Sequence, residues 1–127
     1  MGTPQSRSLI PIYTTRGEAA AFLVYPYLFN PLGEWVGFVT ANREVYSVLG
    51  YYVGFLSKDP RILRKRSEDD LRPRLTPPPA PPRIKVPPTV PLARLMSDLS
   101  HELIDVLEDE PHRLHTPDSG ELRQDMD

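Results

Sequence analysis

The side chains best suited to acid–base chemistry are two glutamates, Glu18 and Glu34, each of which directly follows a glycine. Two carboxylates can act as general acid and general base when a pocket holds them close together. Both glutamates, however, occupy the same place in a repeated segment, and a third copy of this segment has Tyr51 there. Polar residues that flank a turn explain this pattern more simply than a catalytic pair. We therefore predict no catalytic site and no enzymatic activity.

Two histidines, His112 and His115, have a spacing that occurs in metal sites, but they lie in a polar, acidic stretch that lacks carboxylates at fixed positions. The chain has no cysteine, which excludes a disulfide framework, a thiolate metal ligand and a thiol nucleophile. It also contains no glycine-rich phosphate-binding loop. We predict that both histidines are solvated and that the protein holds no metal and no cofactor.

Two large aromatic residues, Trp35 and Tyr52, occupy equivalent places in the repeated segments, where the first copy has Ala19. Exposed aromatic rings bind protein partners or stack on nucleic-acid bases. The alternative, which we favour, is that both rings pack against the next hairpin or against the C-terminal tail, since a small β domain needs such cover.

A basic stretch, residues 61–74, allows a second function, the binding of single-stranded nucleic acid beside those aromatic rings. Acidic residues 68–70 interrupt the stretch, and a solvated strand with internal ion pairs is the interpretation that we favour. The cations that the nucleic-acid alternative requires are Arg61, Arg64, Lys65 and Arg66.

The elements that position these residues are given by a repeat between Ile12 and Leu56, which reads IYTTRGEAAAFL, then LFNPLGEWVGFV, then VYSVLGYYVGFL. The shared glycines are 16 and 17 residues apart, a period that suits a β-hairpin with its connector. Residues 30–33 (NPLG) fit a type I turn followed by a glycine in the left-handed conformation. We predict three sister hairpins.

The shared phenylalanines, Phe22, Phe38 and Phe55, are the predicted core anchors, and we expect them to meet in one interior. Burying each ring contributes about 1.5–3 kcal/mol. An isolated hairpin is marginal in water, so the hairpins need a common core. A fourth copy is half present: residues 61–66 fit a first strand, but the return strand through residues 67–72 is degraded. The predicted fold class is mainly β, a small domain of three to four repeated hairpins around a shared core.

The repeated pattern Tyr/Phe-x-x-x-Gly-x-x-x-Gly/Ala-Phe resembles that of the bacterial four-fold beta flower proteins, over residues 10–71. The resemblance implies hairpins that radiate around a pseudo-fourfold axis and implies no defined activity. A weaker resemblance is to PRC-barrel domains, whose strands have a similar glycine rhythm and serve as binding modules.

The rest of the chain divides by composition. Residues 1–8 form a polar leader, residues 9–72 the hairpin domain, residues 73–91 a proline-rich spacer, and residues 111–127 an acidic disordered tail. The spacer is expected to adopt polyproline II; the alternative is that it wraps across the aromatics of its own domain. Apolar residues recur every three or four positions over residues 92–110 and predict an amphipathic helix there, which Pro111 ends.

Such a helix is marginal alone, so its apolar stripe must dock on its own domain, on a sister subunit or on a partner. We therefore expect a non-enzymatic adaptor or structural module that binds another protein or itself; ring assembly through the hairpins is a further alternative. The net charge of −2 suggests no strongly charged partner, and no signal or membrane segment is seen, so we expect a cytoplasmic protein without membrane contact. The residues expected to contact a partner are Trp35, Tyr52, Leu95, Leu99, Leu103, Val106 and Leu107.

Overall fold

The computed structural model describes residues 8–67 and 72–118, and its strands form one eight-stranded antiparallel sheet in chain order. The chain is mainly β, as the repeat predicts. The strands are β1 (Ile10–Tyr13), β2 (Ala19–Val24), β3 (Tyr27–Phe29), β4 (Trp35–Val39), β5 (Glu44–Ser47), β6 (Tyr52–Leu56), β7 (Ile62–Lys65) and β8 (Leu103–Asp105). A short helix, α1 (Val106–Asp109), and a 3-10 turn, Pro111–Arg113, follow β8. Within the described residues no helix has the length and apolar character needed to cross a bilayer.

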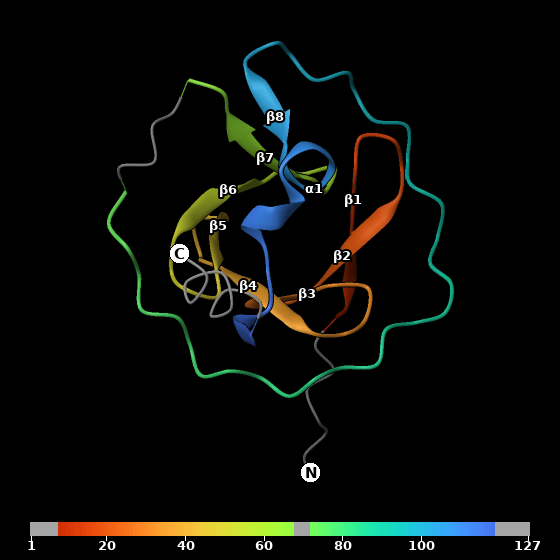
Figure 1. Cartoon of the computed structure of the whole chain (residues 1–127). Coiled ribbons are helices and arrows are strands. Elements are labelled where there is room, and N and C mark those ends of the chain that lie inside the picture. The colour runs from red at the N-terminus through yellow and green to blue at the C-terminus, as the bar shows by residue number, and fades with distance from the viewer. Residues whose placement is uncertain (1–7, 68–71, 119–127) are drawn as a thin grey trace.

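The strands pair as four hairpins that curl around a common centre, over which α1 lies (Figure 1). The first three hairpins are the three sequence repeats. Each turn closes when the glycine N–H donates to the carbonyl three residues earlier: Gly17 to Thr14, Gly33 to Asn30 and Gly50 to Ser47. The three glycines have φ between 82° and 95°, a left-handed conformation that glycine adopts at little cost. The predicted turn chemistry is therefore confirmed.

The fourth hairpin is completed by a strand from the far end of the chain. β7 is the predicted first strand, and its partner is β8, with Leu63 opposite Asp105 and Lys65 opposite Leu103. The predicted degraded return strand falls mainly on residues 68–71, which lie outside the described residues. Because β8 fills the position beside β7, the sheet has four hairpins.

The predicted helix over residues 92–110 is wrong. Residues 92–100 have no regular secondary structure, residues 101–102 form a turn, residues 103–105 are a strand, and only Val106–Asp109 is α-helical. The physical reason is tertiary: the backbone of β7 offers unpaired N–H and C=O groups, and pairing with β8 satisfies them. The apolar stripe is divided between the core and the surface, because Val106 is fully buried while Leu95 is fully exposed.

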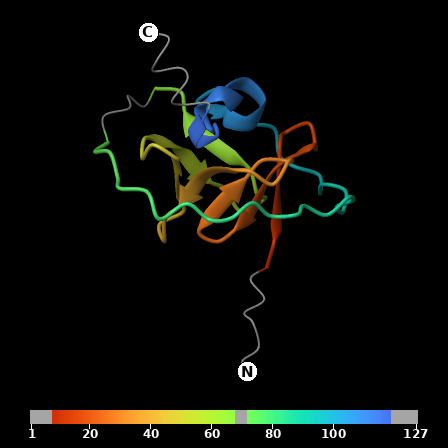
Figure 2. The ribbon, with the colours of Figure 1, turned by 60° about the horizontal axis from the view of Figure 1, so that its bottom comes forward.

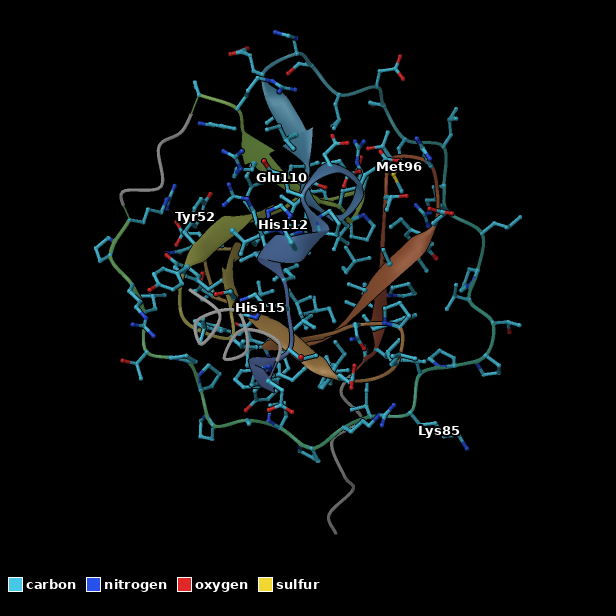
Figure 3. All side chains as sticks on the ribbon, viewed as in Figure 1. Tyr52, Lys85, Met96, Glu110, His112 and His115 are labelled. Carbon is cyan, nitrogen blue, oxygen red and sulfur yellow. The ribbon has the colours of Figure 1, made fainter. Side chains whose placement is uncertain are left out.

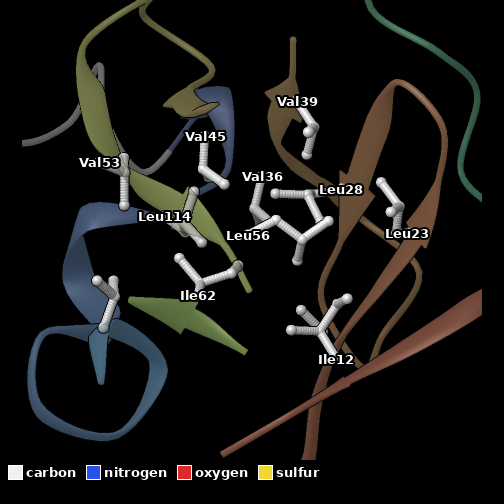
Figure 4. Close-up of a cluster of buried hydrophobic side chains, with 12 residues drawn as sticks. Ile12, Leu23, Leu28, Val36, Val39, Val45, Val53, Leu56, Ile62 and Leu114 are labelled. Carbon is white, nitrogen blue, oxygen red and sulfur yellow. The ribbon is translucent and has the colours of Figure 1, made fainter. Parts of the chain in front are cut away.

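The interior is aliphatic, and the prediction of a shared phenylalanine core is wrong (Figure 4). The residue that follows each phenylalanine enters this core instead, as Leu23, Val39 and Leu56. Neighbouring strand residues point to opposite faces, so the rings lie on the other face. There Phe38 stacks on Tyr46, with ring centroids 5.6 Å apart. The first residue of each of the four repeats is fully buried: Ile12, Leu28, Val45 and Ile62. The fourfold pattern is therefore carried by aliphatic side chains.

Residues 72–102, called the strap below, circle the hairpin domain between β7 and β8 (Figure 1, Figure 2). The predicted free spacer is thus a belt around its own domain, which is the alternative interpretation of the proline-rich segment. The strap bonds to the turns: the N–H of Leu75 donates to the Gly50 carbonyl at 2.9 Å, and that of Ile84 to the Gly33 carbonyl at 3.0 Å.

The strap has a repeat of its own that our sequence interpretation missed. Residues 73–75 (PRL), 82–84 (PRI) and 91–93 (PLA) recur every nine residues. The three copies lie against the hairpin turns in reverse chain order, next to Gly50, Gly33 and Gly17. One strap repeat therefore spans the distance between neighbouring hairpin tips.

Candidate partner-binding groove

The two glutamates considered as an acid–base pair lie on different hairpins and have separate surroundings. Glu18 is exposed, and Glu34 accepts a hydrogen bond from the side-chain amide of Asn30 at 3.0 Å. The carboxylates thus serve as turn-flanking polar groups.

His112 and His115, labelled in Figure 3, line a shallow pocket of about 190 Å³ together with Ser47 and Tyr51. The Ser47 hydroxyl oxygen accepts from the N–H groups of Leu49 and Tyr51, so it stabilises the turn. Among residues 8–67 and 72–118, no group of three or more His, Cys, Asp or Glu side chains is arranged to hold a metal ion. No hydrogen bond joins Ser47 to either histidine among the described residues, so the pocket shows no activated serine and no set of three metal ligands.

The two aromatics expected to contact a partner are packed within the domain. Tyr52 is buried, with its ring edge-on to Tyr46 at 5.7 Å and the Arg72 guanidinium 4.1 Å from its ring centre. Trp35 is half-buried, and its ring N–H donates to the Gly37 carbonyl at 2.8 Å. Tyr52 is thus covered by its own domain, whereas part of the Trp35 ring remains accessible.

The basic stretch is largely committed to internal pairs. Arg61 is buried and donates to Asp59 at 2.6 Å and to Thr15 at 3.0 Å. Arg64 donates to both carboxylate oxygens of Glu110, at 3.0 and 2.9 Å. Contact between these two arginines and phosphates would break those bonds. Lys65 and Arg66 are exposed, and Arg66 donates to the His101 carbonyl.

The carboxylates of these pairs are held in the charged form. Hydrogen bonds from Arg64 lower the pKa of Glu110 against the opposing effect of burial, and the charge of Arg113 adds to the lowering. Burial raises the pKa of Asp59, but hydrogen bonds from Arg61 and Ser57 outweigh it and the net shift is downward. Both carboxylates are therefore ionised at neutral pH, and each forms a salt bridge that holds its part of the fold together.

The residues of the expected helix stripe are mostly directed to the chain's own domain. Val106 belongs to the core, and Leu107 packs against it. Leu99 and Leu103 are half-buried, whereas Leu95 projects into solvent. The C-terminal segment therefore docks in cis, and only its N-terminal end leaves apolar surface free.

That free surface belongs to a groove of about 580 Å³ between β1, residues 58–60 and the third strap repeat. Leu92 and Leu95 have exposed fractions of 95% and 102%, which mark them as the most exposed large apolar side chains of the described chain. The hydroxyl of Tyr13 donates to the Pro91 carbonyl at 2.7 Å and fastens the strap there. The apolar groove, as it is called below, is lined by Ile10, Pro11, Pro60, Pro91, Leu92 and Leu95.

The charges of the apolar groove are positive. Lys58 and Arg94 line it and are exposed, and neither forms an ion pair with another described residue. The one carboxylate in the groove, Asp59, is paired with Arg61. An occupant with apolar side chains and carboxylates matches this surface.

The first two strap repeats show why the third exposes leucine. Arg74 and Arg83 turn back and donate their Nε–H to the carbonyls of Leu49 and Leu32, at 2.6 and 3.0 Å. The third repeat has Leu92 at this position, and a leucine has no donor for the turn. The sequence signal for the groove was therefore the nine-residue repeat, with an apolar residue where an arginine is expected.

The fold and the groove together define a small, mainly β hairpin domain that its own strap encircles, with an apolar groove beside the edge strand β1. Comparisons with protein-family models, with curated protein sequences and with solved structures found no significant match. The resemblance to four-fold beta flower proteins stays a prediction.

Proposed function

We propose that this protein is a non-enzymatic interaction module that binds an apolar, acidic segment of another protein in the apolar groove. The observation that carries the proposal is the full exposure of Leu92 and Leu95 beside Ile10, in a chain that buries the other end of the same apolar stripe. Contiguous exposed apolar surface with a polar rim is typical of interaction sites.

The partner's charge follows from the rim. Lys58 and Arg94 lack acidic partners among the described residues, and carboxylates on the bound segment would supply them. Such rim charges act mainly on the association rate and on the choice of partner, while the apolar contacts supply most of the affinity.

The experiment is a selection from a displayed library of random peptides with the full chain as bait. The expected result is a consensus of apolar residues with Asp or Glu, whose synthetic peptide binds the wild type. The L92S/L95S variant should bind that peptide at least about tenfold more weakly, as two buried leucine contacts are removed.

The matched control is Leu32→Ser, because Leu32 is an exposed leucine on another hairpin turn, outside the apolar groove. This variant should bind the selected peptide as the wild type does. Selected peptides that bind wild type and L92S/L95S equally, or a selection that enriches no apolar acidic consensus, would contradict the proposal.

A further inference from the structure

Two hairpin turns bind two similar segments of the strap in the same way. Hairpin tips two and three, at Gly33 and Gly50, each bind a strap segment of one composition: a proline, an arginine and a branched aliphatic residue. The equivalence extends to single bonds, which makes these tips two copies of one peptide-binding site.

The bonding pattern of the two copies is the same. In each, the arginine donates its Nε–H to the carbonyl of the residue before the turn glycine, and the aliphatic residue donates its N–H to the carbonyl of the glycine itself. In each, the aliphatic residue's carbonyl oxygen lies 1.9 Å from the place of a Cβ on the glycine. Only a glycine lets the bound segment approach this closely.

The first hairpin tip has the same receptor and a poorer ligand. Its glycine is Gly17, with φ 95°, and the strap residues there are Leu92 and Ala93. Neither residue forms the two hydrogen bonds seen at the other tips, within the part of the chain that the structure describes. The nearest strap atom to a Cβ on Gly17 is the Ala93 Cβ at 3.7 Å, so the approach is looser.

We propose that the Gly17 turn is a receptor for an extended Pro-Arg-Leu or Pro-Arg-Ile segment of another protein, which displaces residues 91–93 of the strap. The bound arginine would donate to the Arg16 carbonyl and the aliphatic N–H to the Gly17 carbonyl, as residues 74–75 and 83–84 do at the other tips. A proline-flanked segment is already extended, so binding it costs little conformational entropy.

Another protein is the favoured source, because the strap of a second copy holds its own two Pro-Arg-aliphatic segments in place. Releasing either would break the bonds of Leu75 or Ile84 to their own turns. The acceptors at the tip are backbone carbonyls and not groove side chains, but the two sites share Pro91 and Leu92, so a segment bound at the Gly17 turn would break the Tyr13–Pro91 bond and open one wall of the apolar groove.

The test uses a fluorescent peptide of residues 81–89 (PPRIKVPPT) and the full-length chain, with fluorescence anisotropy as readout. Saturable binding is expected, and the peptide with Arg83→Ala should bind about tenfold more weakly, because one charge-assisted hydrogen bond is lost. No saturable binding at millimolar protein would overturn the proposal.

The decisive variant is L92R/A93I, which gives the third strap repeat the composition of the second. Its own strap should then occupy the Gly17 turn, so the melting temperature should rise and the peptide should bind at least about tenfold more weakly, since the tethered segment competes at high effective concentration. A folded L92R/A93I variant that binds the peptide as the wild type does, or one with a lowered melting temperature, would overturn the proposal.

L92S/L95S separates this inference from the proposed function. This variant should bind the peptide of residues 81–89 as the wild type does, because its strap offers no better ligand to the Gly17 turn. It should bind the apolar acidic peptide much more weakly than the wild type does. Light scattering over a concentration series supplies the remaining arm: growth of a dimer that L92R/A93I abolishes would assign the occupant to a second copy and overturn the choice of another protein.

Discussion

The carbonyl oxygen of Ile84 occupies the space in which residue 33 would carry a side chain: a Cβ on Gly33 would lie 1.9 Å from it. In return, the N–H of Ile84 donates to the Gly33 carbonyl at 3.0 Å. Position 33 therefore requires glycine for two separate reasons, the positive φ and the nearby strap carbonyl. A substitution by alanine, which adds one methyl group, tests both.

Gly33→Ala should destabilise the fold by more than about 2 kcal/mol, since a left-handed alanine costs about 1–2 kcal/mol and the strap must also move. The measurement is urea unfolding of the full chain. Gly17→Ala is the matched control, because Gly17 has φ 95° but the nearest atom to an added Cβ is 3.7 Å away. Its loss of unfolding free energy should come only from the left-handed backbone conformation. Equal losses at the two positions would show that strap contact adds nothing.

Amide hydrogen exchange should divide the strap into bonded and free positions. Leu75 and Ile84 donate to turn carbonyls, so their N–H groups should exchange markedly more slowly than those of Thr76 and Lys85, for which no such bond is seen among the described residues. Ala93 should exchange as fast as the free positions. NMR measures these exchange rates directly. Uniformly fast exchange along the strap would contradict its hydrogen bonds to the hairpin turns.

Asp105→Ala should cost about 3 kcal/mol, because three part-buried donors lose the buried carboxylate that they share as acceptor. The Asp105 carboxylate accepts from the N–H and the hydroxyl of Thr15, each at 2.6 Å, and from the N–H of Glu108 at 3.3 Å. These bonds join the first hairpin to the last, where no strand ladder runs between β1 and β8. Denaturant unfolding of Asp105→Ala and of the exposed control Asp109→Ala should differ by most of this amount.

Val106→Ala should lower the free energy of unfolding by about 2 kcal/mol through lost burial and a residual cavity. Val106 is fully buried in the central cluster, whereas Leu95, from the same apolar stripe, is fully exposed. Leu95→Ala is therefore expected to be neutral in the same thermal or urea unfolding experiment. A large loss from Leu95→Ala would mean that the strap packs differently from the structure.

Stability should fall on acidification partly through Glu110. Because the pKa of Glu110 is lowered in the folded chain, the unfolded chain binds its proton more readily. The contribution is complete above the ordinary value of 4.5, declines as the pH falls below it, and is lost below the lowered pKa. Glu110→Gln should show a shallower loss of stability between neutral pH and acid than the wild type, in urea unfolding at a series of pH values. Identical slopes would contradict the Arg64–Glu110 pair.

The hairpins were predictable because their determinants are local. Residues 30–33 carry a turn signal within four positions, and the glycine spacing repeats it. Alternation within a strand, by contrast, does not say which face is inside. Phe22 and Leu23 are both apolar, and only the assembled sheet shows that Leu23 enters the central cluster.

The C-terminal segment was unpredictable for a different reason. Its apolar spacing fits a helix, but Leu103 pairs with Lys65 across the whole strap, and such a contact has no local signature. The strap repeat was readable in the sequence, since residues 73–75 and 82–84 are nearly identical in type. What those segments bind was not readable, because the acceptors are backbone carbonyls, which every residue has.

The partnership of β7 with β8 has a consequence for synthesis. When residues 62–65 leave the ribosome, the strand that will lie beside them has not been translated, and the intervening belt must be made and wound around the tips before it arrives. Until then the nascent domain has an open edge and lacks Val106 and Leu114 from its interior. The sheet is therefore completed only when Leu103–Asp105 arrives, and a ribosome stalled before the codon for Leu103 would display three completed hairpins and a β7 strand without its β8 partner.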